Sequence, residues 1–323
     1  MADTPLLAIV GPTAVGKSRL ALHLARSLGG EIVNADSRQV YRGMDIGTAK
    51  PSAEERSLVP HHLLDIRNPD EEFSLALFLQ LANTAIVDIH SRGRLPIIVG
   101  GTGQYIWGLL EGWQVPKVAP NPGLRADLEL QVQRRGPWAL YQLLQAVDPE
   151  AAKKTDAKNP RRIIRALEIH FAGGTKPSKP RAKTPRTEPS LVIGLTVDRQ
   201  ELYRRIDDRV DQMMAQGFLE EVKGLLEGGY SPELPSMSGV GYQEIAAHLE
   251  GELPLGEAVQ RIKYRTHRIA RHQYAWFRLK DPRIQWIEAD GREMEVGLQM
   301  AREFLTRCDK ISSVGRPAVD EVH

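Results

Sequence analysis

The sequence GPTAVGKS at residues 11–18 constrains the fold more than any other feature of the chain. It follows an apolar run, Leu6 to Val10, and precedes an amphipathic segment, Ser18 to Leu28. A strand, a glycine-containing loop and a helix in this order form a phosphate-binding loop, because the glycines let backbone N–H groups turn toward one phosphate at the positive end of the helix. We therefore predict a di- or triphosphate site formed by Gly11, Pro12, Thr13, Ala14, Val15, Gly16, Lys17 and Ser18, with Mg²⁺ held by Ser18.

The composition allows a large folded core and gives no sign of membrane insertion. The chain has 323 residues, 41% of them hydrophobic, but each apolar run is far shorter than the roughly 20 residues of a membrane span. The N-terminus has no basic segment followed by an apolar one, so we expect no signal peptide. The single cysteine, Cys308, cannot form an internal disulfide. These features favour a protein of the reducing cytoplasm.

Short apolar segments alternate with amphipathic ones in the first third of the chain, which is typical of a parallel sheet with helices on both faces. We predict an α/β fold of the P-loop NTPase-like type, with a first core part at 1–113, a mostly helical insertion at 114–190, a second core part at 191–308 and a disordered tail at 309–323. The predicted strands are 6–10, 31–35, 95–99, 191–197 and 284–287. The predicted helices are 18–28, 75–90, 103–110, 124–134, 138–147, 161–171, 199–214, 219–226, 255–279 and 294–306.

Basic residues are concentrated in two segments, although the net charge is only +2. Residues 153–186 contain eleven Lys or Arg against two acids, and residues 261–283 contain eight against one. Each segment alone could be the solvated face of a surface helix. Two such segments in a chain with a phosphate loop make a polyanion, and specifically a nucleic acid, the better prediction.

Two further strand ends carry candidate site residues. The strand at 95–99 is followed by glycines and Thr102, with no acid where a nucleotide-hydrolysing enzyme places its metal ligand. Asp65 in the run HHLLD is a weaker candidate for that acid, because its context resembles a loop. Asp36 follows the strand at 31–35, so it should face the same crevice as the phosphate loop. It could bind a metal, accept a proton or cap a helix.

Several longer segments resemble the tRNA dimethylallyltransferases, also called isopentenyl-tRNA transferases. The segments are GPTAVGKS at 11–18, DSRQVYRGMDIGTAKP at 36–51, HHLLDI at 61–66, VGGTGQY at 99–105, NPRRIIRALEIH at 159–170, GVGYQEI at 239–245 and the basic stretch at 266–278. Together they span about residues 5 to 290. The stretch at 266–278 departs from many relatives because it carries His267 and His272, which leaves its tRNA contacts open. No zinc-finger sequence follows the core.

The resemblance implies transfer of the dimethylallyl group from dimethylallyl diphosphate to the exocyclic 6-amino group of the adenosine 3′ of the anticodon, in tRNAs that read codons beginning with U. The phosphate loop would then hold the allylic diphosphate, with Mg²⁺ as the cofactor. By similarity, Asp36 accepts or orients the amine proton, Thr102 contacts the reacting oxygen, and Arg125 completes the catalytic set. The resemblance also implies a set of tRNA-binding residues: Asp36, Ser37, Arg38, Gln39, Thr102, Arg125, Arg161, Arg162, Arg165, Gly239, Gly241 and Tyr242.

Two alternatives belong to other functional classes. An adenylate isopentenyltransferase acting on free AMP, ADP or ATP would share the fold but would not need so large a basic insertion. A P-loop kinase or a nucleotide-driven RNA-binding switch would need a metal-binding acid that the sequence does not clearly offer. We therefore expect a cytoplasmic, monomeric tRNA-modifying enzyme without an obligate protein partner or a membrane association.

Overall fold

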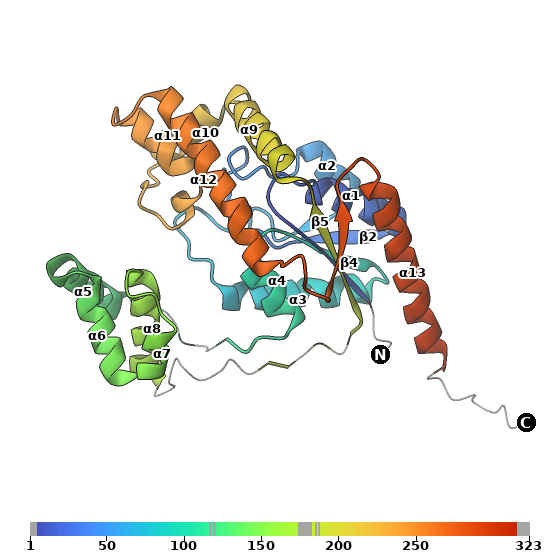
Figure 1. Ribbon diagram of the computed structural model, residues 1–323, viewed down its shortest axis with the longest axis horizontal. Helices are drawn as coiled ribbons and strands as arrows, with labels where there is room; N and C mark the ends of the chain where they lie inside the picture. The colour runs from blue at the N-terminus through green and yellow to red at the C-terminus, as the bar shows by residue number, and fades with distance from the viewer. Residues whose placement is uncertain are drawn as a thin grey trace, which may run out of the picture. The chain divides into compact units, whose positions relative to one another are not determined.

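The computed structural model describes residues 5–115, 118, 121–173, 183–184, 186 and 188–314. Its centre is a sheet of six parallel strands in the order β3-β2-β4-β1-β5-β6 (Figure 1). The strands are β1 (Leu6–Val10), β2 (Gly30–Asn34), β3 (His61–His62), β4 (Leu95–Val99), β5 (Ser190–Thr196) and β6 (Ile284–Glu288). The carboxyl ends of parallel strands meet at one edge, so the loops after β1, β2 and β4 lie together there.

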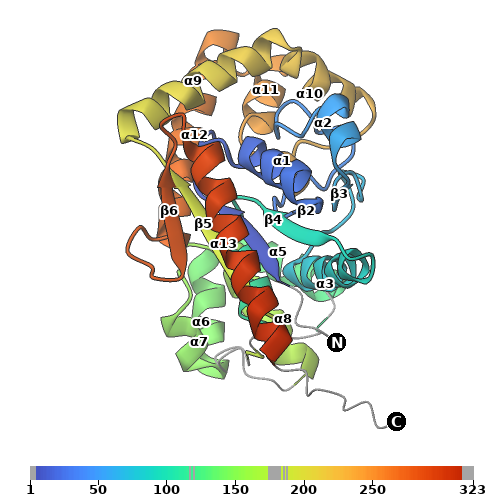
Figure 2. The same cartoon turned by 90° about the vertical axis from the view of Figure 1, so that its right-hand side faces the viewer.

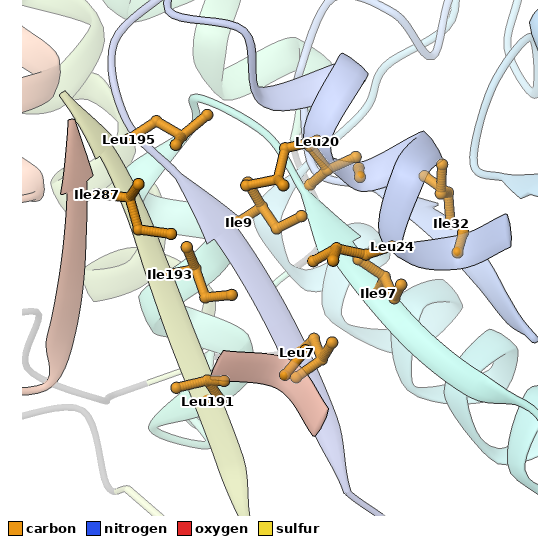
Figure 3. Packing of buried hydrophobic residues seen from close by; sticks show 14 of the residues in the cluster. Leu7, Ile9, Leu20, Leu24, Ile32, Ile97, Leu191, Ile193, Leu195 and Ile287 are labelled. Atoms are coloured by element: carbon orange, nitrogen blue, oxygen red, sulfur yellow. The ribbon is translucent and has the colours of Figure 1, made fainter. Parts of the chain in front are cut away.

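One face of the sheet is covered by α1 (Lys17–Leu28) and α13 (Glu293–Val314), and the first turns of α9 (Arg199–Ala215) join the same hydrophobic core. Alternate strand residues such as Leu7, Ile9 and Ile97 point to this face, because successive side chains of a strand alternate between its two sides. Leu20 and Leu24 of α1 pack against them (Figure 3). Figure 2 shows α13 in front of the strands, next to α1.

Two helices, α3 (Leu75–Ser91) and α4 (Gly103–Leu110), pack against each other, and α3 also contacts β2 and β4. Phe78 of α3 stacks on Tyr105 of α4 with a ring-centroid distance of 4.1 Å. Because α4 starts directly after the turn that follows β4, this packing fixes the turn against the sheet.

A second hydrophobic core joins the helices α10 (Phe218–Glu227), α11 (Tyr242–Leu249) and α12 (Leu255–Trp276) to the segment after β2. Short helices α2 (Ala53–Leu58) and η1 (Ser236–Ser238) flank this region. Val40, Tyr41 and Met44 are buried among these helices, so the chain that leaves β2 is anchored by its apolar side chains. Its first residues, including Asp36, are thereby fixed between the sheet and the helical core.

Residues 113–184 form a separate compact unit, while 1–112 and 185–323 form the other. The small unit contains α5 (Pro122–Arg135), α6 (Pro137–Val147), α7 (Pro149–Lys153) and α8 (Pro160–Gly173). Its core is made of aliphatic side chains, among them Leu140, Leu144, Ile163 and Leu167. A bridge pairs Trp113 with Lys183, so the two chain segments that bound the unit lie side by side.

The structure confirms the predicted parallel α/β sheet and corrects several predicted element ends. The predicted helix 294–306 begins at Glu293 and continues to Val314, so the first part of the predicted tail, 309–314, is helical. Residues 315–323 lie outside the described residues. The predicted helix 255–279 ends at Trp276. Not predicted were α2, α7, α11, η1 and the two-residue strand β3, which are short and show little periodicity.

Candidate active site

The phosphate loop connects β1 to α1 with the backbone geometry that an anion site requires. Ala14 and Gly16 have φ angles of 63° and 105°, in the left-handed region, and Gly16 occupies the N-cap position of α1 without a side-chain cap. The N–H groups at the start of α1 therefore point toward the crevice. Lys17 Nζ donates a hydrogen bond to the carbonyl oxygen of Pro12 at 2.7 Å, which folds its ammonium group back over the loop.

A crevice of about 660 Å³, its solvent-open part included, lies beside this loop. Residues from segments far apart in the sequence line it: the phosphate loop and α1, the end of β2 and the residues after it, residues 48–55, residues 61–64, the turn after β4 and helix α9. The lining residues that carry polar groups include Thr13, Lys17, Ser18, Asn34, Asp36, Gln39, Gly100, Gly101 and Arg209. The structure thus brings Asp36 into one crevice with the phosphate loop, as the strand order predicted.

Three charged side chains face one another in this crevice. The pKa of Lys17 is lowered to about 8. Burial is the largest cause, the carboxylate of Asp36 opposes it, and the positive charge of Arg209 adds to it. Burial also lowers the pKa of Arg209, and Asp36 opposes that effect. Glu55 also lines the crevice, so two cations are matched by two carboxylates, and it is the position of Lys17 and Arg209 close to each other at the phosphate loop that suits a diphosphate.

Arg209 was not predicted as a site residue from the sequence. It lies on α9 beside the buried residues Leu202, Ile206 and Val210, so it occupies the edge of the helix's apolar stripe. Arg209 makes no hydrogen bond with another of the residues that the structure describes, and its guanidinium is available to a ligand. An arginine at the edge of an otherwise apolar helix stripe was the signal in the sequence that could have identified it.

Asp36 sits at the start of a turn and does not cap a helix. Its backbone N–H donates to Asn34 Oδ1 at 3.2 Å, and its Oδ1 accepts the N–H of Arg38 at 2.8 Å. Within the described part of the chain no residue donates to its Oδ2. One carboxylate oxygen therefore orients the side chain, and the other is left for a proton or a metal.

Thr102 is tied directly to the residue after Asp36. Its Oγ1 accepts the backbone N–H of Ser37 at 3.2 Å, and Thr102 occupies the N-cap position of α4. Because the hydroxyl accepts this bond from another loop, it makes no capping bond to its own helix. The two sequence-predicted residues Asp36 and Thr102 are thus neighbours in the structure.

The next two residues of the predicted tRNA-binding set hold the surrounding loops together. Gln39 Nε2 donates to the carbonyl oxygens of Thr48 and Ala49, at 3.0 and 3.1 Å. The Arg38 guanidinium donates to the carbonyl oxygens of Pro235 and Ser236 and to Ser238 Oγ. Arg38 thereby joins the loop after β2 to the turn that precedes the predicted contact at Gly239.

Tyr242 is fully buried, and its side chain contacts other parts of the protein. Its hydroxyl donates to Glu221 Oε1 at 2.7 Å, and burial, with Glu221 adding to the effect, raises its pKa. The same Glu221 carboxylate accepts the N–H groups of Asp45, Ile46 and Gly47. The side chain of Tyr242 therefore supports the loop after β2 through Glu221. Because it is fully buried, it presents no surface of its own to a ligand in this structure.

Asp65 is engaged away from the crevice. Its carboxylate accepts hydrogen bonds from Lys50 and Arg56, and it is not among the residues that line the phosphate site. Burial raises the pKa of Asp65, but the bonds from Lys50 and Arg56 outweigh it and hold the pKa below its usual value. The alternative of Asp65 as the metal ligand is not supported by this geometry.

The donor set of the crevice fits Mg²⁺. The hydroxyl of Ser18 and the carboxylate of Asp36 are hard oxygen donors that line the same space. Mg²⁺ binds few protein ligands and completes its octahedron with substrate phosphates and water, so these two groups are sufficient. No cluster of three His, Cys, Asp or Glu that could form a dedicated metal centre occurs among the described residues, including the pair His61 and His62.

Gly241 occupies the N-cap position of α11, and the four remaining predicted residues, all arginines, belong to the small unit. Arg161 and Arg162 are exposed on α8, whereas Arg165 and Arg125 donate to the buried carboxylate of Glu168. Burial raises the pKa of Glu168, but the bonds from Arg125, the N–H of Asn121 and Arg165 outweigh it and lower the pKa. Of the predicted stripe of three arginines, Arg161 and Arg162 are therefore exposed, whereas the guanidinium of Arg165 is bound to Glu168.

The protein-family model described as IPP transferase matches residues 39–280, which is most of the chain. The chain belongs to this family. A second family model, described as Isopentenyl transferase, matches residues 4–68. Two curated members of the family are similar over most of their length: the tRNA dimethylallyltransferase of Roseiflexus castenholzii is 56% identical over 90% of this chain and 94% of that protein, and that of Thermomicrobium roseum is 53% identical over 88% and 86%.

Solved structures of the family have the same fold. The tRNA isopentenylpyrophosphate transferase of Bacillus halodurans is 39% identical, covers 96% of this chain and 99% of its own, and superposes with a TM-score of 0.70. A eukaryotic dimethylallyltransferase described as acting on tRNA is 30% identical, covers 98% of this chain and 81% of its own, and has a TM-score of 0.80. The family of tRNA prenyltransferases predicted from the sequence is confirmed, in preference to the free-nucleotide enzyme and the kinase.

Among the described residues, no helix combines the length and the apolar character that a membrane crossing requires.

Proposed function

We propose that this protein transfers the dimethylallyl group of dimethylallyl diphosphate to the exocyclic 6-amino group of the adenosine 3′ of the anticodon, in tRNAs that read codons beginning with U. The observation that carries the proposal is the single crevice in which the phosphate loop, Asp36 and Arg209 face one another, in a chain of the IPP transferase family. Such a crevice can hold an allylic diphosphate at one end and a nucleophilic amine at the other.

The donor's diphosphate binds where the positive groups converge. The N–H groups at the start of α1, Lys17 and Arg209 stabilise the charge that develops on pyrophosphate as the bond between C1 and its oxygen breaks. Ser18 would hold Mg²⁺, which would supply charge neutralisation on the leaving diphosphate. These groups act most strongly on the transition state, because the negative charge on the leaving oxygen grows as the bond opens.

The amine attacks from the side of Asp36. The adenine N6 forms a bond to C1 of the dimethylallyl group, pyrophosphate leaves, and the proton lost by N6 passes to the free Oδ2 of Asp36. Arg38 N–H holds Oδ1 of the same carboxylate at 2.8 Å and so fixes its direction. Thr102, held by Ser37 next to Asp36, is placed to contact the reacting oxygen.

An adenosine stacked in an anticodon loop cannot reach this crevice unless its nucleotide turns out of the stack. Ser37, Arg38 and Gln39 follow Asp36 directly and Gln39 lines the same crevice, while Gly239 and Gly241 come just after the residues 235–238 that Arg38 holds. Arg125 completes the catalytic set proposed by similarity, and Arg161 and Arg162, exposed on α8, contact tRNA phosphates. We place the enzyme in the cytoplasm as a monomer without an obligate protein partner.

A transfer assay tests the proposal with labelled dimethylallyl diphosphate, Mg²⁺ and two acceptors in parallel. Unmodified tRNA with an anticodon that reads a U-starting codon should take up label, and free AMP should not. Label in AMP alone would indicate the free-nucleotide enzyme, and label in neither acceptor would contradict prenyl transfer.

A further inference from the structure

Gln273, on the last turns of α12, joins two loops of the active site through one side-chain amide. Its Oε1 accepts the backbone N–H of Thr13 in the phosphate loop at 2.7 Å. Its Nε2 donates to the carbonyl oxygen of Gly101, in the turn after β4, at 3.1 Å. A primary amide can do both at once because it carries a donor and an acceptor side by side.

The end of α12 is held closely against this turn. A Cβ at Gly103 would lie 2.3 Å from Cγ of Trp276, so that position requires glycine, and a Cβ at Gly101 would lie 2.1 Å from Gln273 Nε2 and would displace the amide. Trp107 of α4 donates its indole N–H to the carbonyl oxygen of Trp276 at 3.0 Å. Gln273 therefore projects from a fixed backbone and has little freedom to choose other partners.

A further hydrogen bond links the turn that contains Gly101 to the segment that carries Asp36. Thr102, the next residue of the turn, accepts the N–H of Ser37, and Ser37 follows Asp36 directly. A continuous path of bonded groups thus runs from Thr13 through Gln273, the turn and Ser37 to Asp36. It connects the loop that binds the donor to the residue that receives the proton.

We propose that Gln273 is a positioning residue for prenyl transfer, which sets the phosphate loop against the turn that carries Thr102. The proposal rests on the proposed function, because its role is to keep the diphosphate at a fixed distance from Thr102 and Asp36. A misplacement of reacting groups by about 1 Å can cost about 100-fold in rate, so a single bridging amide has a measurable effect. Gln273 touches neither the donor nor the amine in this role.

Gln273→Leu replaces the amide with an apolar side chain of similar size and so removes both hydrogen bonds. We expect the single-turnover transfer rate, with saturating donor and tRNA, to fall about 10- to 100-fold. Inorganic pyrophosphate should bind about three- to tenfold more weakly, because the loop loses one bond that orders it. The amide of Thr13 should exchange its proton with solvent at least about tenfold faster. Gln260→Leu, exposed on the same helix, is the matched control and should change none of these.

Gln273→Glu separates positioning from packing, because it keeps the shape of the side chain. The carboxylate can still accept the N–H of Thr13, but it cannot donate to Gly101 unless it is protonated. The carbonyl oxygen of Gly101 and the bound diphosphate both favour the protonated form. The transfer rate of this variant relative to the wild type should therefore rise as the pH falls from about 8 to about 6.

Three results would overturn the proposal. A Gln273→Leu variant with the wild-type transfer rate and a fast-exchanging Thr13 amide would show that the bridge is structural only. Equal losses in Gln260→Leu would mean that α12 is generally sensitive, and a Gln273→Glu ratio that does not change with pH would exclude the donated bond. A wild-type protein that binds pyrophosphate but transfers nothing would refute the proposed function alone, and pyrophosphate affinity and Thr13 exchange would still decide the role of Gln273.

Discussion

At the scale of single residues, Asp36 has a carboxylate oxygen that no described residue occupies, a property that it shares with Glu55, the other carboxylate lining the crevice, whose Oε2 accepts the N–H of Ser52. Asp65 is bound by Lys50 and Arg56, and Glu221 by three backbone N–H groups and a tyrosine. We expect Asp36→Asn to lower the single-turnover transfer rate by about two to four orders of magnitude, because asparagine keeps the bond to the N–H of Arg38 but cannot accept a proton.

The measurement is a rapid-quench assay with tRNA and donor both saturating, accompanied by tRNA affinity. Asp88→Asn, an exposed carboxylate on α3, serves as the control and should leave the rate unchanged. A loss of tRNA binding that accounts for the whole decrease in rate would assign Asp36 to binding instead of proton transfer.

The pKa of Lys17 predicts the pH dependence of donor binding. Burial lowers this pKa to about 8, so the ammonium group is mostly charged at neutral pH and loses its proton as the pH rises through 8. A neutral Lys17 no longer attracts the diphosphate, so kcat/KM for the donor should fall about tenfold for each pH unit well above 8. The rate at saturating donor should fall less, because a bound diphosphate favours the charged form.

The test measures kcat/KM for dimethylallyl diphosphate between about pH 6.5 and 9.5. Lys17→Arg provides the comparison, since a guanidinium stays charged throughout this range. If the decline appears unchanged in Lys17→Arg, another group causes it.

At the scale of elements, Glu168 holds α8 against the start of α5 in the small unit. It is fully buried and accepts bonds from Arg125, Arg165 and the N–H of Asn121. Glu168→Gln removes the charge that both arginines need, so we expect the unit to lose about 3 kcal/mol of stability. Since the folded-state pKa is lowered, this stabilisation is complete above the unfolded carboxyl pKa of about 4.3 and is lost as the pH falls through the lower folded value.

Hydrogen exchange of peptides from residues 122–173 measures this loss within the unit. Glu150→Gln is the matched control, because Glu150 forms an exposed pair with Lys153 on α7 and should change stability by less than about 0.5 kcal/mol. Similar protection in the two variants would mean that the buried carboxylate contributes little.

The elements that were predicted well are those whose pattern is local. The strand at 95–99 and the helix at 103–110 have the predicted ends, because an apolar run and a glycine turn mark both of them. Strand β3 is set by pairing of His61 and His62 with β2, a long-range effect that two residues cannot display in sequence. Arg209 left only a weak signal, its place at the edge of the apolar stripe of α9, and it is the packing of α9 that brings it to Lys17 and Asp36.

The number of basic residues in a segment overestimates its positive surface charge, because some of them form ion pairs in the folded protein. In the basic segment at 261–283, Arg261, Lys263 and Arg265 pair with Glu257, Asp211 and Glu244. Arg268 and Arg278 form no ion pair with another described residue. The positive surface of α12 is therefore smaller than the sequence predicted, because acids from other elements neutralise part of it.

At the scale of the whole molecule, the chain divides into a unit that carries the crevice and a helical unit that carries exposed arginines. If the helical unit contacts tRNA, reversing charge at Arg161 and Arg162 should weaken tRNA binding and reduce its salt dependence. Each lost phosphate contact lowers the slope of log K against log salt by about 0.7 to 0.9, so two contacts should lower it by about 1.4 to 1.8. Pyrophosphate affinity should not change, because the phosphate loop belongs to the other unit.

The variant Arg161→Glu with Arg162→Glu is compared with Arg134→Glu with Arg135→Glu, which makes the same charge change at exposed positions of α5 in the same unit. Equal losses in both variants would indicate a general electrostatic field, because a field responds to net charge wherever it is placed. A loss confined to Arg161 and Arg162 would identify α8 as a phosphate-contacting helix, since only direct contacts depend on position. An unchanged slope in both would separate tRNA recognition from the helical unit and assign it to the surface around Arg38 and α12.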